Sequence, residues 1–115
     1  MMRGVLAVAM LSCLLTYVSP AFGGTVNGNS DKGKPLFQAR CSFCHGPTGR
    51  GDGPAGAALK PPPTNFSSPE YWKSADINRL RAVLKSGKQG TAMPPSQLAP
   101  EEIDDVIAYL RTLAK

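Results

Sequence analysis

The sequence predicts an all-α fold in one small domain. Two segments repeat apolar residues at helical steps of three and four, a third carries a short apolar face, and no segment alternates apolar and polar residues as a half-buried strand does. Residues 46–69 are dense in glycine and proline, so we expect loop rather than regular structure there. A chain of 115 residues without internal repeats is long enough for a single domain of modest size.

The first helix is expected over about residues 31–40. Leu36 and Phe37, together with Ala39, would form its apolar face. Pro35 fits this helix where it lies in the first turn, because a missing N–H has no intrahelical partner to lose there.

The second helix is expected from about Asp76 to Ser86. Ser74 is the predicted N-cap, and Gly87 suits the C-cap, where glycine adopts a left-handed backbone most easily. Its apolar positions recur at helical spacing: Ile77, Leu80 and Leu84.

The last helix is the clearest of the three and starts near Pro100. Glu101 and Glu102 follow at once, where acidic side chains favour the positive end of the helix dipole. One apolar stripe runs along it, formed by Ile103, Val106, Ile107, Leu110 and Leu113.

The N-terminus has the layout of a secretory signal peptide. Arg3 precedes an apolar core at Val5–Val18, and a small-residue segment follows, with cleavage expected after Ala21 or Gly23. An uncleaved membrane anchor is less favoured, because this core is about 14 residues long and a span needs about 20. We therefore expect residues 1–23 to be removed and residues 24–115 to be exported, most simply to the periplasm, with no transmembrane anchor.

The chemistry is carried by Cys41–Ser42–Phe43–Cys44–His45, a C-x-x-C-H motif typical of c-type haem attachment. Two thiols three residues apart can each join one vinyl group of the same porphyrin, and His45 then faces the iron. Its second ring nitrogen needs a fixed acceptor, and a carbonyl of Pro61–Pro62–Pro63 is our hypothesis for that acceptor. The same chain also carries an export signal, which proteins with covalently attached haem require.

Two other chemistries compete for this motif. A thioredoxin-like disulfide needs a βαβ context, which the sequence lacks. A structural zinc site takes four ligands, but with Cys13 inside the signal segment only Cys41, Cys44 and His45 remain. Haem attachment is therefore the favoured interpretation.

Met93 is predicted to be the sixth iron ligand, largely by elimination. It is the single methionine and His45 the single histidine left after signal removal. Ordinary core packing is the alternative role for a lone methionine, but Pro94 and Pro95 place Met93 in a stiff loop. A thioether ligand raises the reduction potential and fills the site. Lysine ligation and an open iron stay as alternatives.

Other features have two interpretations each. The glycine run at residues 46–56 lacks the ending of a phosphate-binding loop, and we expect its backbone to pass close to the haem. Tyr71 and Trp72 either bond a haem propionate or pack in the core. The net charge of +5 indicates either steering toward an acidic protein partner or an ordinary solvated surface. Basic residues form no dense run with interleaved aromatics, which argues against nucleic-acid binding.

With these motifs in order, the chain resembles a small bacterial class I cytochrome c over essentially its whole mature length. The match comprises Gly33-x-x-x-Phe37, Cys41–Ser42–Phe43–Cys44–His45–Gly46, Gly49-x-Gly51–Asp52–Gly53, Pro62–Pro63-x-Asn65–Phe66, Met93–Pro94 and Val106-x-x-Tyr109. The resemblance implies three to five helices around one covalent haem c, with the first and last helices packed together.

The resemblance also implies a role: an electron-transfer protein rather than an enzyme, working with protein redox partners. It would be a free shuttle or the cytochrome subunit of an oxidoreductase complex. The alternative of a different class is a haem enzyme or a gas- or peroxide-responsive sensor with an open sixth site. Binding of Met93 to the iron would distinguish the electron carrier from this alternative.

Overall fold

The computed structural model describes residues 25–115, which contain helices and no strand. The elements in chain order are α1 (Ser30–Arg40), α2 (Ser42–His45), the 3₁₀ turn η1 (Gly56–Ala58), α3 (Pro69–Ser74), α4 (Ile77–Ser86) and α5 (Pro100–Thr112). The all-α prediction is confirmed. The predicted signal peptide at residues 1–23 lies outside the described residues.

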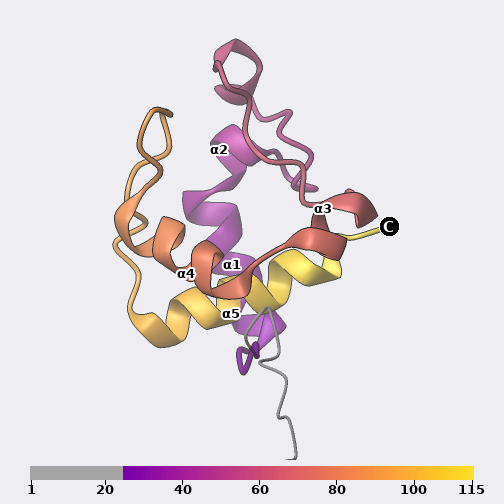
Figure 1. The fold of residues 1–115 in the computed structure, drawn as a ribbon, viewed down its shortest axis with the longest axis vertical. Helices are drawn as coiled ribbons and strands as arrows, with labels where there is room; N and C mark the ends of the chain where they lie inside the picture. The colour runs from indigo at the N-terminus through magenta and orange to yellow at the C-terminus, as the bar shows by residue number, and fades with distance from the viewer. Residues whose placement is uncertain (1–24) are drawn as a thin grey trace, which may run out of the picture.

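The helices α1 and α5 form the most extensive helix pair of the fold and cross each other (Figure 1). Gly33 lies at the crossing, where a Cβ atom would be 1.9 Å from the Asp105 carbonyl oxygen. One turn further along α1, the rings of Phe37 and Tyr109 lie 5.4 Å apart. The expected packing of the first helix on the last is therefore confirmed, and glycine is what allows the close approach.

The start of α1 differs from the prediction. Asn29 is its N-cap and accepts hydrogen bonds from the backbone N–H groups of Asp31 and Lys32, so Pro35 lies beyond the first turn. Proline removes the bond to the Asp31 carbonyl, but both residues are exposed and water can satisfy that oxygen. Ala39 is also exposed, so its predicted place on the apolar face is wrong.

The cap of α4 differs too. Asp76, not Ser74, is the N-cap, and its carboxylate accepts from the N–H groups of Asn78 (2.9 Å) and Arg79 (3.3 Å). Ser74 instead ends α3. The C-cap prediction is confirmed, since Gly87 has φ +77° and its N–H donates to the Val83 carbonyl at 2.7 Å.

The short helix α3 was not predicted, because none of its six residues is buried and so no apolar stripe marks it. The residues on its inner side still stabilise the fold. Trp72 donates its indole N–H to the Phe66 carbonyl at 2.7 Å, and Arg111 of α5 lies 5.7 Å from the centre of the Trp72 ring.

The last helix follows the prediction closely. Pro100 is its first residue, and the Glu102 carboxylate accepts from the Ala99 N–H at 2.8 Å. Four of the five stripe residues are buried and Leu113 is half-buried at the end. The core of the described residues consists of Phe37, Phe66, Ile77, Leu80, Leu84, Ile103, Val106, Ile107 and Leu110.

Two loops complete the fold, residues 46–68 and residues 87–99. They rise on either side of α2 (Figure 1), the first interrupted by η1. Within residues 25–115, the helices are all too short or too polar to cross a membrane.

Candidate functional site

The C-x-x-C-H motif forms a single helical turn set off from α1 by a break at Cys41. The Cys41 backbone leaves ideal helical geometry (φ −120°), and α2 then begins with the His45 N–H donating to the Cys41 carbonyl at 2.9 Å. Cys41 and Cys44 are half-buried free thiols. Phe43 between them points outward and is 67% exposed.

The Cys41 thiol has the wrong electrostatics for the attacking group of a redox disulfide. Burial raises the pKa of the Cys41 thiol to about 11; neighbouring Arg40 opposes the rise and Cys44 adds to it. Thioredoxin-like chemistry needs a lowered cysteine pKa, so the structure gives it no support. A zinc centre also lacks support, because residues 25–115 bring no three His, Cys, Asp or Glu side chains together to hold a metal.

The glycine-rich loop closes around the backbone of the motif. The N–H groups of Gly51 and Gly53 donate to the carbonyls of His45 (2.7 Å) and Cys44 (3.1 Å), which α2 leaves without helical partners. Gly51 has φ +84°, and a Cβ there would be 2.6 Å from the Pro63 carbonyl oxygen. Cβ atoms on Gly53 and Gly56 would also lie within 3 Å of backbone carbonyl oxygens, so these glycines pack on protein backbone, while the expected closeness of the run to the haem stays a prediction.

His45 is held in one orientation. Its side chain is 9% exposed, and Nδ1 lies 3.2 Å from the Thr64 carbonyl oxygen. A carbonyl only accepts hydrogen bonds, so Nδ1 carries the proton and Nε2 presents a lone pair. Burial lowers the pKa of His45, against a smaller rise from the Thr64 carbonyl, so the imidazole is neutral at neutral pH. The predicted Pro61–Pro63 acceptor is therefore wrong by one residue.

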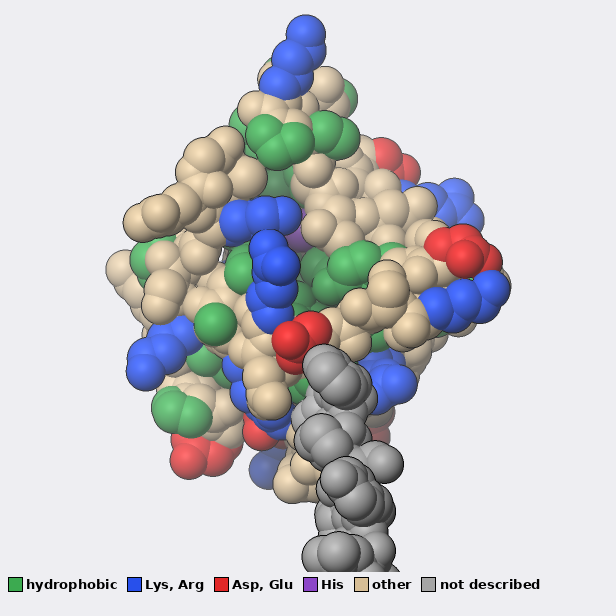
Figure 2. Space-filling model, in the orientation of Figure 1, with side chains coloured by type: hydrophobic (Ala, Val, Ile, Leu, Met, Phe, Trp, Pro, Cys, Tyr) green, Lys and Arg blue, Asp and Glu red, His purple; other side chains and the backbone are tan. Residues whose placement is uncertain are grey.

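A cavity lies between the two loops. It has two lobes of about 300 and 280 Å³, and the residues that line both are Cys41, His45, Leu84 and Met93. Cys44 lines the second lobe only. Figure 2 shows this hollow, with histidine visible at its floor and basic side chains across its mouth. The cavity therefore brings together the four residues predicted to hold the cofactor, namely Cys41, Cys44, His45 and Met93.

The wall of the larger lobe is mostly apolar and comes from α1, α4, α5 and the Phe66 region. Its apolar members are Phe37, Phe66, Leu80, Val83, Leu84, Val106 and Leu110. Such a lining excludes water and favours a large flat apolar ligand.

Tyr71 and Trp72 have different roles. Trp72 packs against the core with its N–H bonded to Phe66, whereas Tyr71 lines the cavity and burial raises the pKa of its phenol. Arg79 and Lys88 also line the larger lobe, and the sequence did not single them out. The available signal was sequence spacing: Arg79 lies four residues before Val83 of α4, and Lys88 lies four residues after Leu84, just beyond the end of that helix.

These features together fit a haem. The apolar lobes suit the porphyrin, and the thiols of Cys41 and Cys44 line the cavity that would hold it. The neutral imidazole of His45 and the thioether of Met93 line the same cavity. Arg79 and Lys88 supply positive charge of the kind that porphyrin carboxylates need.

Comparison with known proteins supports the same identification. A family model described as Cytochrome c matches residues 30–114. The chain is 29% identical over 113 residues to a cytochrome c-553-like protein of Synechocystis, covering 95% of this chain and 92% of that protein. It is 29% identical over 112 residues to cytochrome c6 of Gloeothece citriformis, covering 95% and 93%.

Solved structures share the fold. One is a chain of the Kuenenia stuttgartiensis reducing HAO-like protein complex Kustc0457/Kustc0458, with a TM-score of 0.59, 24% identity, and coverage of 75% of this chain and 43% of that one. Another is the c-type cytochrome KustC0563, with a TM-score of 0.59, 24% identity, and coverage of 72% and 98%. The motif, the cavity and the family match agree, and we conclude that the chain belongs to the cytochrome c family, which implies covalent haem c and electron transfer.

Proposed function

We propose that this protein is an exported monohaem c-type cytochrome that carries single electrons between redox partners and catalyses no reaction of its own. The observation that carries the proposal is the shared lining of both cavity lobes, where Cys41, His45 and Met93 come together. The haem supplies one-electron redox chemistry when bound, and the protein holds it, shields it and sets its potential.

Each residue of the site has a part in this proposal. Cys41 and Cys44 hold the haem covalently, and His45 and Met93 are the iron ligands. The Thr64 carbonyl orients His45, because its bond with the Nδ1–H leaves Nε2 as the only nitrogen free to bind iron. With His45 and Met93 as its two ligands, the iron would favour the reduced state and would have no position free for oxygen or peroxide, which favours a carrier over an enzyme.

Arg79 on the cavity wall binds a porphyrin carboxylate in this proposal. It extends from α4, and Tyr71 adds a neutral phenol to the same lobe. Lys88, in the loop after α4, is exposed and remains available to a partner. The alternative role of Trp72 at a propionate is set aside, since its only N–H is already bonded to Phe66.

The partners in this proposal are redox proteins with acidic docking surfaces. Arg40, Arg79 and Lys88 lie around the cavity, and among residues 25–115 Asp76 is the one acid on its wall. Electron-transfer rates to an acidic partner should fall as ionic strength rises. Lys88→Gln should slow association while Lys115→Gln, a matched change at the exposed C-terminus, should not. Equal rates for both variants would contradict this surface.

Export is part of the proposal. Residues 1–23 act as the signal peptide, with cleavage after Ala21 or Gly23, and the mature chain from residue 24 works in the periplasm. Mass spectrometry of the periplasmic protein gives its first residue. Size-exclusion chromatography of the native extract distinguishes a free shuttle from a subunit of an oxidoreductase complex.

The central test is Met93→Ala in protein expressed with a haem-maturation system. The variant should lose the long-wavelength absorbance band of methionine–iron bonding and bind carbon monoxide readily when reduced, unlike the wild type. An unchanged spectrum would show that another group binds the iron. Retention of the pigment after denaturation and acid extraction tests the thioether links, and Cys41→Ala with Cys44→Ala is the control that should release it.

A further inference from the structure

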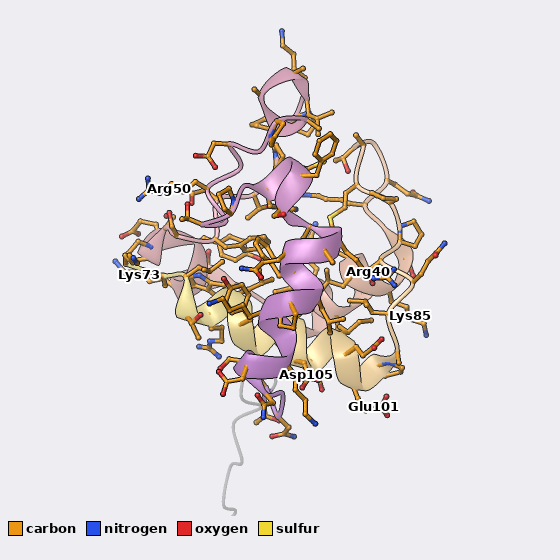
Figure 3. The ribbon with its side chains drawn as sticks, turned by 180° about the vertical axis from the view of Figure 1, so that it is seen from behind. Arg40, Arg50, Lys73, Lys85, Glu101 and Asp105 are labelled. Carbon is orange, nitrogen blue, oxygen red and sulfur yellow. The ribbon has the colours of Figure 1, made fainter. Side chains whose placement is uncertain are left out.

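The loop that presents Met93 is anchored at both ends. The Ser96 N–H donates to the Leu84 carbonyl at 2.9 Å, and Arg40 donates from α1 to the Ser96 carbonyl at 3.2 Å. Figure 3 shows Arg40 pointing from α1 toward this loop. At the other end Gly87 follows α4 directly. These bonds fix where the loop leaves and rejoins the helices, but they do not fix its tip.

The tip is closed by one side chain. The Thr91 hydroxyl donates to the Lys88 carbonyl at 2.7 Å and accepts from the Met93 N–H at 3.2 Å. The Met93 carbonyl in turn accepts from the Lys88 N–H at 3.1 Å. Both backbone polar groups of Met93 are therefore held, one of them by Thr91.

Packing supports one side of this closure, where a Cβ on Gly87 would lie 2.8 Å from the Met93 carbonyl oxygen. A Cβ on Gly90 would meet nothing within 4 Å, so that side of the turn is open. Pro94 and Pro95 have no N–H, so no backbone donor follows Met93 until Ser96. The hydroxyl of Thr91 is thus the side chain that holds the backbone of Met93, together with the backbone bond from the Lys88 N–H.

We propose that Thr91 is a positioning residue for Met93. Its hydroxyl fixes the backbone from which the thioether extends, and so it sets how strongly the sulfur competes for the iron against other ligands. This inference rests on the proposed ligation by Met93, and it assigns to Thr91 no contact with the haem itself.

The test uses imidazole as a competing ligand for the oxidised, haem-loaded protein. Imidazole binds only where Met93 has left the iron, so its apparent affinity rises as the hold on Met93 weakens. Thr91→Val keeps the shape and removes the hydroxyl, with its bonds to the Lys88 carbonyl and from the Met93 N–H. Loss of the bond that holds the Met93 N–H should by itself raise the apparent imidazole affinity about 2- to 10-fold. Thr91→Ser keeps the hydroxyl and should behave as the wild type.

The matched control is Thr112→Val. It removes a similar hydroxyl-to-carbonyl bond, from Thr112 to Tyr109 at 2.6 Å, at the far end of α5. It should leave imidazole binding unchanged. Should Thr91→Val fail to load haem, Thr91→Ala against Thr91→Ser gives the same comparison, since that pair differs only in the hydroxyl.

The outcomes separate this inference from the proposed function. Met93→Ala should bind imidazole far more tightly than the wild type; if it does not, the ligand assignment itself is wrong. If Met93→Ala behaves as expected but Thr91→Val binds imidazole like the wild type, or Thr91→Ser binds it like Thr91→Val, only the role of Thr91 is overturned.

Discussion

Replacing Gly33 by alanine tests the close crossing of α1 and α5. A Cβ there would lie 1.9 Å from the Asp105 carbonyl oxygen and 2.5 Å from its carbon, so backbone must move by about 1.5 Å to reach ordinary contact at 3.4 Å. Figure 3 labels Asp105 beside α1 at this point. No rotamer change relieves a clash with backbone, so the cost should reach the upper part of the overpacking range, about 3 kcal/mol.

Part of that cost is returned by helix propensity. Alanine is about 1 kcal/mol better than glycine inside a helix, so Gly33→Ala should lower the free energy of unfolding by about 2 kcal/mol. For a domain of this size the melting temperature should fall by about 8–16 °C. Urea unfolding of the haem-loaded protein, followed by helical circular dichroism, measures the loss.

The control for propensity is the pair Lys34→Ala and Lys34→Gly on the exposed side of α1. There alanine should be the more stable by about 1 kcal/mol, opposite in sign to the change at Gly33. If Gly33→Ala were as stable as the wild type, or more stable, the two helices could not approach as closely as argued.

Three further substitutions test individual contacts by urea unfolding of the haem-loaded protein. Asp76→Ala should lower the free energy of unfolding by about 1 kcal/mol because the N-cap of α4 is lost, while Asp76→Asn should keep most of the capping stability. Equal losses for the two variants would contradict the role of Asp76 as the cap. Trp72→Phe should cost about 1 kcal/mol, because the Phe66 carbonyl loses its donor; no loss would mean that water replaces the indole. Arg81→Met breaks the 2.6 Å ion pair between Arg81 and Asp104, side chains that are 29% and 28% exposed. The free energy of unfolding should fall by about 0.5–1 kcal/mol. The Arg81 loss should shrink in high salt, and a salt-independent loss would assign it to packing instead.

The helices show how far local pattern reaches. The helices α4 and α5 were predictable because each carries its own apolar stripe, whereas α1 buries only Gly33 and Phe37, and α5 begins at Pro100 as its sequence signals indicate. The helix α3 was missed because no residue in it is buried. The cap of α4 was misplaced because Ser74 and Asp76 are both good N-caps, and the choice depends on where α3 ends.

The functional site divides in the same way. A C-x-x-C-H motif, one histidine and one methionine outside the predicted signal peptide are local facts, and these predicted the cofactor and the candidate ligands. The acceptor of His45 was missed by one residue, since it depends on how the loop at residues 46–68 folds back across the motif.

What the sequence by itself determined about this protein is its chemistry and most of its helices: a thiol pair beside an imidazole, one thioether outside the predicted signal peptide, and the periodic apolar faces of α4 and α5. Only the tertiary structure decided that Thr64 orients His45, that Arg79 and Lys88 line the cavity, and that Thr91 closes the turn beneath Met93. The physical reason is the sequence separation of the residues involved. A motif or an apolar stripe lies within one turn or one helix, and its period can be recognised in the sequence. These contacts instead depend on the conformations of two irregular loops, which have no repeating sequence period.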